Sequence, residues 1–424
     1  MSSMLILFGG MILLIMIGVP VGYAIGTSTI LTFIFFTDVP LNLIAQNCFT
    51  GLNSFTLLAI PFFILAGVIM GAGGIAKRLI DLADSIIGWI TGGLGMVGVM
   101  TSTFFGAITG SGVATASAVG SLVLPAMKEK KYDTPFSATL IASAGAIGII
   151  IPPSIPFVIY GVATGTSISD LFIAGVIPGL LMALALMTTC FIISKRRGYG
   201  GSGTKFQLKN VAVCTKRGIW ALLAPVIILG GIYTGAVTPT ESAVVAVVYS
   251  ILVGFFLYRE LTIKKLFKAL YDAAIINGIT SFIMGFSAVM AKYLSIDNIP
   301  VKVCDAVLSL TDNKILVLLL LNIILLVVGM LIDIVPATII LAPIFLPIVM
   351  SFGMSPVQFG VMMAMNLGIG FVTPPYGATL FVTSAITKTP VEKLFKNAFF
   401  FTGVLCIVLL LVTYIPATTM FLIE

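Results

Sequence analysis

The sequence predicts an all-α polytopic membrane protein built as an inverted repeat, with two re-entrant hairpins and two broken helices. Of its 424 residues, 59% are hydrophobic and only 9% are charged, whereas soluble domains carry about 25% charged residues. The mean hydropathy is +1.20. The 43 Gly and 20 Pro are typical of membrane helix bundles, where both residues are commoner than in soluble helices. A water-soluble fold, a disordered chain and a nucleic-acid-binding module are therefore excluded.

The composition also excludes most enzyme chemistry. The chain has no histidine, the commonest metal ligand and general base, which removes serine-hydrolase triads and zinc proteases. The five cysteines form no C-x-x-C pair and support neither a zinc site nor a disulfide framework. The sequence also has no G-x-x-x-x-G-K-[ST] nucleotide loop, so energy must come from an ion gradient or another subunit. We expect a protein that is not an enzyme and needs no cofactor.

Apolar runs of about 20 residues, enough to cross roughly 30 Å of hydrocarbon, suggest about eleven spans. They lie near residues 4–36, 54–72, 86–104, 137–165, 171–193, 219–236, 240–258, 273–291, 315–331, 357–387 and 398–416. Two further apolar stretches, 105–127 and 332–350, are interrupted by Gly, Ser, Asp and Pro and follow the preceding run without a polar loop. Irregular backbone at this depth needs protein or a water-filled cavity around it. We therefore expect both stretches to be re-entrant hairpins beside a binding site.

A repeat relates the two halves of the chain. Residues 111–180, shifted by 222 positions onto 333–402 without a gap, superpose three motifs. These are Leu-Pro at 124–125 and 346–347, Gly148 and Gly370, and Pro-Pro at 152–153 and 374–375. Three motifs in one register indicate an internal duplication rather than chance.

The distribution of charge indicates that the two copies are inverted. Residues 128–133 carry three lysines, while their counterparts at 350–355 carry no charge. Conversely, residues 166–174 hold one acidic residue, while 388–396 hold three lysines. Under the positive-inside rule, such loops lie on opposite sides of the membrane. The basic cluster at 259–268 also looks cytoplasmic, which leaves the number of spans and the side of the termini open.

These features divide the chain into five parts. They are a first scaffold with an interfacial arm (1–104), a first transport repeat (105–193), a basic cytoplasmic linker (194–218), a second scaffold with its arm (219–314) and a second transport repeat (315–424). The linker is placed in the cytoplasm because residues 195–217 hold seven basic and no acidic side chains. Amphipathic stretches at 75–87 and 262–272 are expected to be arms that lie along the interface and join a static scaffold to a moving domain.

In each copy, small and hydroxyl-bearing residues precede a helix that is broken at a proline pair. The hairpin stretches are 109–112 and 333–338, and the breaks are 151–154 and 373–376. Proline removes a helical N–H and clashes with the carbonyl four residues back, so each break frees backbone carbonyls. Carbonyls and hydroxyls suit sodium, while the N-termini of half-helices favour anions. The pattern predicts a cation site beside an anion site; the alternative is a pair of proline kinks that only pack.

Asp333 stands in an otherwise apolar run at the second hairpin. A carboxylate at bilayer depth costs at least about 2.5 kcal/mol unless it is paired or coordinated. Asp333 has two possible roles, which are sodium coupling and a structural hydrogen bond. The equivalent residue in the first copy is Ser111, so the two copies need not bind a cation with equal strength.

Five segments resemble the large membrane subunit, of the DctM or SiaM type, of the tripartite ATP-independent periplasmic (TRAP) transporters. They are LNSFTLLAIPFF at 52–63, GSGVAT at 110–115, GIIIPPS at 148–154, TPTESA at 238–243 and GMLID at 329–333. The resemblance covers essentially the whole chain, and it looks closest to the sialic-acid subgroup.

The resemblance implies a sodium-driven secondary transporter of the bacterial inner membrane that works by an elevator mechanism. It implies two protein partners, a small four-helix membrane subunit and a periplasmic protein that delivers the substrate. We expect the small subunit to be a separate polypeptide. The resemblance and the chemistry above assign substrate binding to Ser111, Ser154, Thr373, Tyr376 and Thr379. They assign sodium binding to Thr109, Gly110, Ser111, Pro152, Asp333, Thr338, Thr373 and Pro374.

We therefore expect the chain to import an organic carboxylate with sodium, with sialic acid favoured. The alternatives are a C4-dicarboxylate TRAP subunit and a stand-alone sodium/dicarboxylate carrier, which would transport without a binding protein. A channel is a further alternative, but two hairpins that meet in mid-membrane favour alternating access over a continuous pore.

Overall fold

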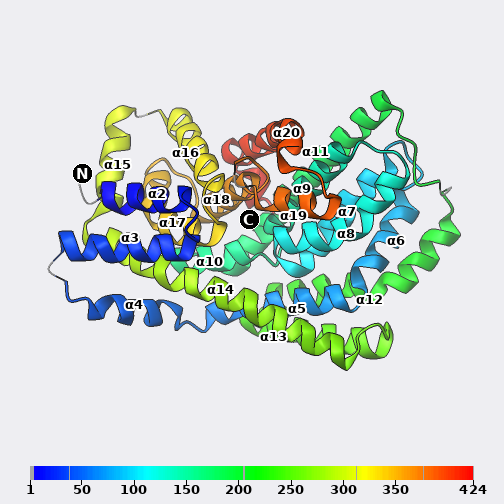
Figure 1. The fold of residues 1–424 in the computed structure, drawn as a ribbon, viewed down its shortest axis with the longest axis horizontal. Coiled ribbons are helices and arrows are strands. Elements are labelled where there is room, and N and C mark those ends of the chain that lie inside the picture. The colour runs from blue at the N-terminus through cyan, green and yellow to red at the C-terminus, as the bar shows by residue number, and fades with distance from the viewer. Residues whose placement is uncertain (1–3, 38, 204–205, 312, 376, 424) are drawn as a thin grey trace.

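The chain forms a bundle of helices in two layers (Figure 1). This computed structural model describes residues 4–37, 39–203, 206–311, 313–375 and 377–423, with only the backbone of 307–310. Every regular element among these described residues is helical. The predicted all-α fold is confirmed.

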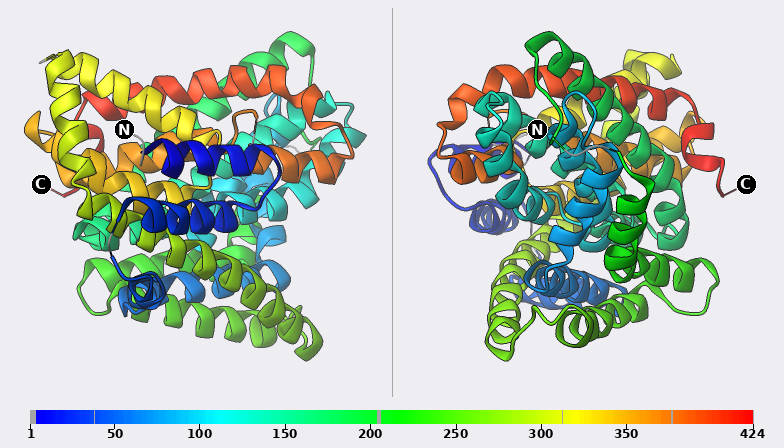
Figure 2. Two further views of the ribbon diagram at one scale, coloured as in Figure 1. Left: turned by 60° about the vertical axis from the view of Figure 1, so that its left-hand side comes forward. Right: turned by 90° about the vertical axis from the view of Figure 1, so that its right-hand side faces the viewer.

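The scaffold forms the lower layer in Figures 1 and 2, where α4, α5, α13 and α14 run side by side. Helix α14 is the centre of this layer, because it packs against α3, α4 and α5, while α5 packs against α13. The scaffold helices are α3 (Val21–Phe36), α4 (Asn42–Leu52), α5 (Ala59–Ala72), α12 (Leu208–Tyr233), α13 (Pro239–Leu252) and α14 (Ile263–Ile296). Two short elements, η1 (Leu5–Gly9) and α2 (Gly10–Met16), pack on α3, and η2 (Thr56–Leu58) precedes α5. A π-helical segment, η3 (Val253–Leu257), extends α13.

The upper layer, called the core below, contains the two transport repeats. The first copy is α7 (Gly93–Thr109), α8 (Gly112–Glu129), α9 (Thr134–Ile150), α10 (Ile155–Thr164) and α11 (Ile168–Arg197). The second copy is α16 (Lys314–Gly329), α17 (Ile334–Ser351), α18 (Pro356–Gly370), α19 (Ala378–Thr387) and η4 with α20 (Val391–Leu394, Phe395–Tyr414), followed by α21 (Ala417–Met420). In each copy the first two helices form a hairpin and the next two form a broken helix.

The helix boundaries follow the register of the sequence repeat. Helices α8 and α17 both have 18 residues, and they begin at Gly112 and Ile334, which are 222 positions apart. The two copies also interlock, since α10 of the first packs on α17 of the second, and α19 of the second packs on α8 of the first. Such an exchange of half-helices buries the broken segments inside protein, as irregular backbone in a membrane requires.

Contacts between loops of the two copies show that they are inverted. The Tyr160 hydroxyl near the end of α10 donates to the carbonyl of Pro356 at the start of α18, at 2.8 Å. At the other end, Phe136 near the start of α9 packs against Phe401 of α20, with ring centroids 5.9 Å apart. The turn before α18 therefore lies beside the turn after α10, while the turn before α9 lies beside the turn after α19. Equivalent turns are at opposite ends of the core.

Two helices connect the scaffold to the hairpins. Helix α6 (Ile75–Ile87) contacts α12 and α7, and α15 (Ile299–Leu310) contacts α14 and α17. Figure 1 places them at opposite ends of the long axis, as two inverted copies require. The interpretation of 262–272 as the second arm was wrong, because residues 263–272 continue into the 34-residue helix α14. The arm is instead α15, which starts 224 residues after α6.

The sequence suggested about eleven spans. Within the described residues, seven helices are long and apolar enough to cross a membrane, or up to nine if each bent pair counts as one span. The hydrophobic run at 86–104 is not a separate span, because α7 starts at Gly93 and forms the first arm of a hairpin. Helix α7 also runs across the division expected at residues 104 and 105. The run at 4–36 splits, since α2 ends at Met16 and α3 begins at Val21.

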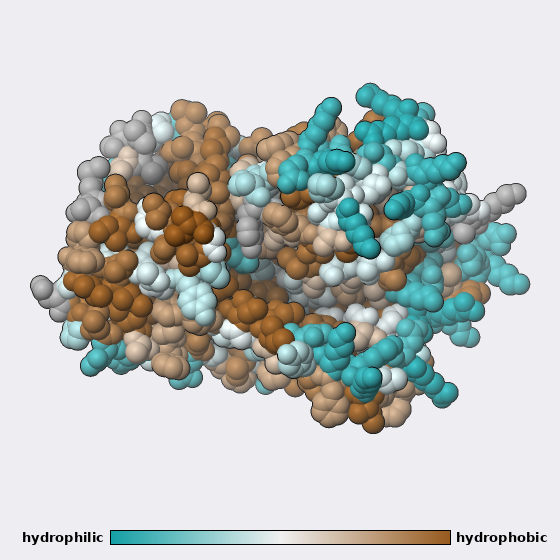
Figure 3. All heavy atoms as spheres, viewed as in Figure 1, coloured by the Kyte–Doolittle hydropathy of each residue, from teal (hydrophilic) through white to brown (hydrophobic). Residues whose placement is uncertain are grey.

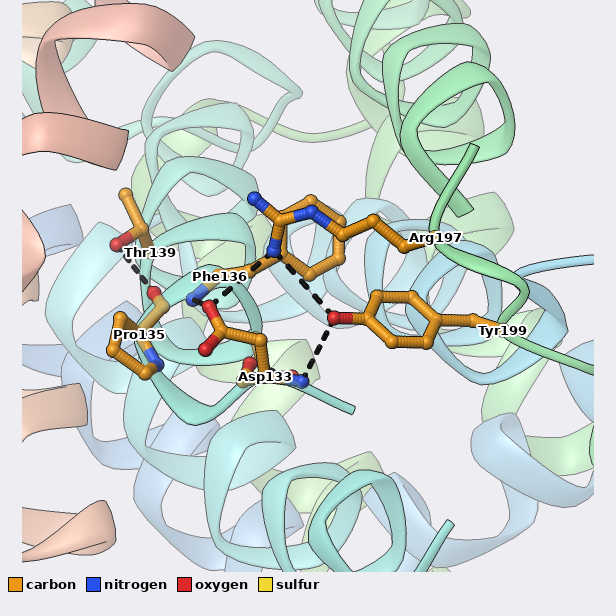
Figure 4. Close-up of polar contacts among 7 residues, drawn as sticks. Asp133, Pro135, Phe136, Thr139, Arg197 and Tyr199 are labelled. Atoms are coloured by element: carbon orange, nitrogen blue, oxygen red, sulfur yellow. Dashed lines mark hydrogen bonds and ion pairs between the residues drawn. The ribbon is translucent and has the colours of Figure 1, made fainter. Parts of the chain in front are cut away.

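Charged residues gather at one end of the molecule, the right-hand end of Figure 3, where Figure 1 labels α6 and α12. In this region the linker meets the first repeat (Figure 4). Asp133 caps α9 by accepting from the Phe136 N–H at 3.0 Å, and Arg197 pairs with the same carboxylate at 3.4 Å. The Tyr199 hydroxyl accepts from the Asp133 N–H at 3.1 Å. These contacts hold the basic linker against the lysine-rich turn, and under the positive-inside rule we expect this end to be cytoplasmic.

Candidate functional site

The tip of the first hairpin is a tight turn between α7 and α8. Gly110 has φ +61°, a conformation that favours glycine. Ser111 then caps α8 by accepting from the Ala114 N–H at 3.4 Å. The Thr109 hydroxyl lies 3.1 Å from the Thr115 hydroxyl and accepts from the Ser111 N–H at 3.4 Å. The tip therefore gathers hydroxyl and carbonyl oxygens at the N-terminus of a helix.

This tip lies directly on the first helix break. The Ile155 N–H approaches the Gly110 carbonyl at 3.4 Å, and a β-carbon on Gly110 would lie 2.6 Å from the carbonyl oxygen of Pro153. Ser154 is fully buried; its hydroxyl donates to the carbonyl of Ile149 and accepts from the N–H of Phe157. Ser154 thus satisfies the C-terminus of one half-helix and the N-terminus of the next.

The second hairpin turns through residues 330–333, and Asp333 caps α17. Its carboxylate accepts from the Val335 N–H at 3.1 Å, and the side chain is partly buried. One turn further on, the Thr338 hydroxyl donates to the Ile334 carbonyl at 2.7 Å. Among the described residues, no cationic side chain forms an ion pair with Asp333. An acidic side chain at a helix N-terminus is favoured electrostatically, and this one lines the cavity described below.

At the second helix break, threonines close the gap between α18 and α19. The Thr379 hydroxyl donates to the Phe371 carbonyl at 2.9 Å, and the Thr373 hydroxyl donates to the Ile369 carbonyl at 2.7 Å. Thr373 also lies 2.9 Å from the hydroxyl of Thr402. Both threonines are fully buried and Pro374 is buried between them. Tyr376, expected to bind substrate, lies outside the described residues.

Glycine contacts bring each hairpin close to the broken helix of its own copy. A β-carbon on Gly106 would lie 2.4 Å from the backbone of Gly148, and one on Gly370 would lie 2.3 Å from the backbone of Gly329. The repeat register had marked Gly148 and Gly370, but sequence reasoning did not assign them this role. The available signal was a second glycine on the preceding hairpin arm in each copy. Two backbones can touch only where both helices carry a glycine.

A cavity of about 690 Å³ brings both hairpin tips together with the scaffold. Four of the expected site residues line it: Thr109, Gly110, Ser111 and Asp333. The scaffold wall comes from α5 and α14, including Gly67, Asp272, Ile276 and Thr280. The other expected residues in the described part are buried and do not line the cavity: Pro152, Ser154, Thr338, Thr373, Pro374 and Thr379.

The cavity extends from the hairpin tips along α8 toward the lysine-rich turn. Its wall follows α8 from Ser111 through Ser117 and Ser121 to Leu122, in the direction of Lys128. The scaffold residues were missed by the sequence analysis, because Asp272 was interpreted as part of an interfacial arm. The available signal was an acidic residue ten positions into a 34-residue helix, followed by no charged residue until Lys292.

A helical membrane protein with two inverted hairpins, two broken helices and a cavity between them and a scaffold has the architecture of a secondary transporter. The chain belongs to a transporter family. A family model described as "Tripartite ATP-independent periplasmic transporter, DctM component" matches residues 8–418. The resemblance seen in the sequence is confirmed, and the chain is a multi-pass protein of a bacterial inner membrane.

Named relatives differ in the anion for which they are named. The isethionate TRAP transporter permease protein DctMQ of Oleidesulfovibrio alaskensis is 43% identical over 98% of this chain and 66% of its own length. The C4-dicarboxylate large permease DctM of Pseudomonas aeruginosa is 40% identical over 94% of this chain and 93% of its own. The sialic acid permease SiaT of Haemophilus influenzae is 36% identical over 96% of this chain and 66% of its own. The chain thus spans about two thirds of the first and third of these relatives.

The fold also has a solved counterpart. The crystal structure of the Alcanivorax borkumensis YdaH transporter, described as having an unusual topology, superposes with a TM-score of 0.61. The match covers 88% of both chains at 13% sequence identity. Identity this low supports the shared fold and nothing further.

Proposed function

We propose that this chain is the translocating subunit of a sodium-driven importer for a small organic anion. The observation that carries the proposal is the cavity, in which both hairpin tips meet two scaffold helices. Alternating access needs a binding site between a moving part and a fixed part. A continuous pore would not require two closed helical tips at its centre.

The charges of the cavity favour coupling to a cation. Asp272 and Asp333 both line it, and none of the described Lys or Arg side chains does. An anion would meet two carboxylates unless cations entered with it. The N-termini of α8 and α17 also lie at the cavity, through Ser111 and Asp333, and favour the anion by their dipoles. Sodium and anion binding would therefore support each other.

The repeat supplies one proposed ion site in each copy. The first would use oxygens of the tip and break formed by Thr109, Gly110, Ser111 and Pro152. The second would use Asp333, Thr338, Thr373 and Pro374. For the substrate, Ser111 is the candidate already at the cavity surface, while Ser154, Thr373 and Thr379 are buried, do not line the cavity and would position the backbone of the breaks.

We further propose that the core moves against the scaffold as in an elevator. Scaffold and core each contribute a separate wall of the cavity, and α6 and α15 bridge the two layers. Movement of the core along α5 and α14 would carry the bound ions and anion across the membrane. The arms would change their tilt while keeping contact at both ends.

The proposed partners are a small membrane subunit and a periplasmic binding protein that delivers the anion. Sialic acid, which the sequence analysis favoured, is one candidate substrate. Relatives named for isethionate, C4-dicarboxylates, sialic acid and 2,3-diketo-L-gulonate make an organic carboxylate or sulfonate the supported class.

Uptake into proteoliposomes tests this proposal. The chain and its small-subunit partner are reconstituted, and labelled isethionate, succinate and sialic acid are offered with and without an inward sodium gradient. Each substrate is tested with and without the binding protein. The proposal predicts uptake of one of these anions that requires both the gradient and the binding protein.

The other outcomes distinguish the alternatives. Uptake with sodium but without the binding protein would support the stand-alone carrier. Uptake that is insensitive to sodium would contradict the coupling, and a current without saturation would indicate a channel.

A further inference from the structure

A second cavity lies at the charged end of the molecule and shares no lining residue with the transport cavity. It has a volume of about 790 Å³ and opens between the arm α6, the scaffold helix α12 and the turn that joins η3 to α14. Its lining is Lys77, Arg78, Asp81, Asp84, Asn210, Cys214, Lys216, Arg217, Trp220, Leu257, Tyr258 and Glu260.

The charges of this cavity leave a net positive charge. Four lining side chains are cationic, two on α6 and two on α12, and three are acidic, which gives a formal charge of +1. Arg78 is already engaged, because it pairs with Glu260 at 2.8 Å and lies 3.7 Å above the ring of Tyr258. Lys216 and Arg217 on the scaffold are exposed. One monovalent anion would balance the cavity.

One wall of the cavity is apolar and continues onto the surface of membrane-spanning helices. Trp220 is 39% exposed on α12 and Leu257 is 47% exposed at the end of η3. Their neighbours Ile219 and Phe256 are also exposed, at 37% and 69%. Tryptophan and basic side chains together are typical of the boundary between lipid and water. A ligand here would have its charged end among the basic residues and its apolar part along α12 and η3.

We propose that this cavity binds the phosphate group of an anionic phospholipid. Lys216 and Arg217 of the scaffold and Lys77 of the arm would contact the phosphodiester, and the acyl chains would lie against Trp220 and Leu257. Basic pockets between membrane helices on the cytoplasmic side suit such headgroups. A phosphodiester whose headgroup alcohol is neutral carries a single negative charge. This charge would balance the formal charge of +1 of the cavity. A zwitterionic lipid adds no net charge and would bind less tightly.

Native mass spectrometry of the full chain in detergent tests the proposal. Phosphatidylglycerol and phosphatidylcholine with matched acyl chains are titrated, and sn-glycerol 3-phosphate serves as the soluble phosphate. The double variant Lys216→Gln/Arg217→Gln should bind phosphatidylglycerol about 30-fold more weakly, since each basic side chain near the membrane contributes about a factor of five. Lys77→Gln alone should weaken it about fivefold.

The matched control is Lys264→Gln/Lys268→Gln, which removes two exposed charges from the same end but outside the cavity. It should retain the affinity of the wild type. An equal loss of phosphatidylglycerol affinity in both double variants would mean that the lipid is attracted by the general surface charge and not by this cavity. That result would overturn the proposal. It would also be overturned if phosphatidylcholine bound as tightly as phosphatidylglycerol, or if glycerol phosphate bound as tightly as the lipid. Unchanged melting temperatures establish that the variants are folded.

Discussion

At the scale of single residues, the two hairpin tips use the same position for different chemistry. Ser111 and Asp333 are related by the repeat and both cap the following helix through their side-chain oxygens. The cap in the first copy is neutral, whereas the cap in the second carries a negative charge that no described side chain neutralises through an ion pair. A cation should therefore bind more tightly at the second tip.

Asp333→Asn removes the carboxylate but keeps the helix cap, because asparagine is as good an N-cap as aspartate. We expect the sodium concentration for half-maximal uptake to rise about 10- to 100-fold, as charge-assisted contacts are worth about 1.5–3 kcal/mol. Sodium titrations of uptake measure the change. Asp305→Asn, at an exposed position on α15, is the control. Unchanged sodium activation in the folded Asp333 variant would remove this residue from the ion site.

Gly110→Ala tests the packing of the first tip on the helix break. The variant would strain a residue at φ +61° and place a methyl group 2.6 Å from the Pro153 carbonyl oxygen. Gly165→Ala carries a similar strain at φ +72°, but open space surrounds it. We expect Gly165→Ala to lose about 1–2 kcal/mol and Gly110→Ala to lose about 1–3 kcal/mol more through the overlap. Thermal unfolding in detergent compares the two, and equal losses would argue against the contact.

At the scale of elements, the sequence repeat located most of the core correctly. The duplication inferred from residues 111–180 and 333–402 has a structural counterpart, because the equivalent positions Gly112 and Ile334 both begin 18-residue helices. Both proline pairs lie at the breaks between half-helices, as expected. These features follow from local rules of capping and proline geometry, so one sequence is enough to find them.

Other elements could not be assigned from local rules. Hairpin arms are as apolar as true spans, so the run at 86–104 was counted as a span although α7 belongs to a hairpin. The arm α15 was missed because 262–272 is also amphipathic, and only its continuation into α14 shows that it belongs to the scaffold. At the site, the hairpin tips were predicted, whereas Gly67 and Asp272 were not, because tertiary packing alone brings α5 and α14 to the cavity.

The glycine crossing between α16 and α18 gives a prediction at this scale. Gly370→Ala places a methyl group 2.3 Å from the backbone of Gly329, where no flexible side chain can yield. We expect loss of at least about 1–3 kcal/mol of stability and poor expression. Gly368→Ala, two residues earlier, meets its nearest atom at an ordinary 3.5 Å and should be neutral or stabilising by up to about 1 kcal/mol. Melting temperatures of both variants measure the difference, and a tolerated Gly370→Ala would contradict the close crossing.

At the scale of the whole molecule, the transport cavity lies between two layers that are built differently. The scaffold contacts the core through few elements, mainly α5 and α14 on the hairpins, whereas the two repeats interlock within the core. The core can therefore move as one body, while the arms α6 and α15 keep it attached. The proposed lipid site lies where α6 meets the scaffold, on the side of the arm away from the cavity.

A disulfide between scaffold and core tests this movement most directly. A β-carbon on Gly67 of α5 would lie 3.2 Å from that of Thr109 on the first hairpin, close to the separation in a disulfide. In the variant Gly67→Cys/Thr109→Cys, uptake in the reduced state is the reference, because Thr109 is a proposed sodium ligand and its loss lowers uptake by itself. We expect oxidation to abolish the uptake that remains and reductant to restore it. The control is Gly285→Cys, whose β-carbon would lie 2.6 Å from the sulfur of native Cys48 within the scaffold; its oxidation should leave uptake unchanged. Uptake by the oxidised Gly67–Thr109 variant that equals its uptake in the reduced state would contradict movement of the core against the scaffold.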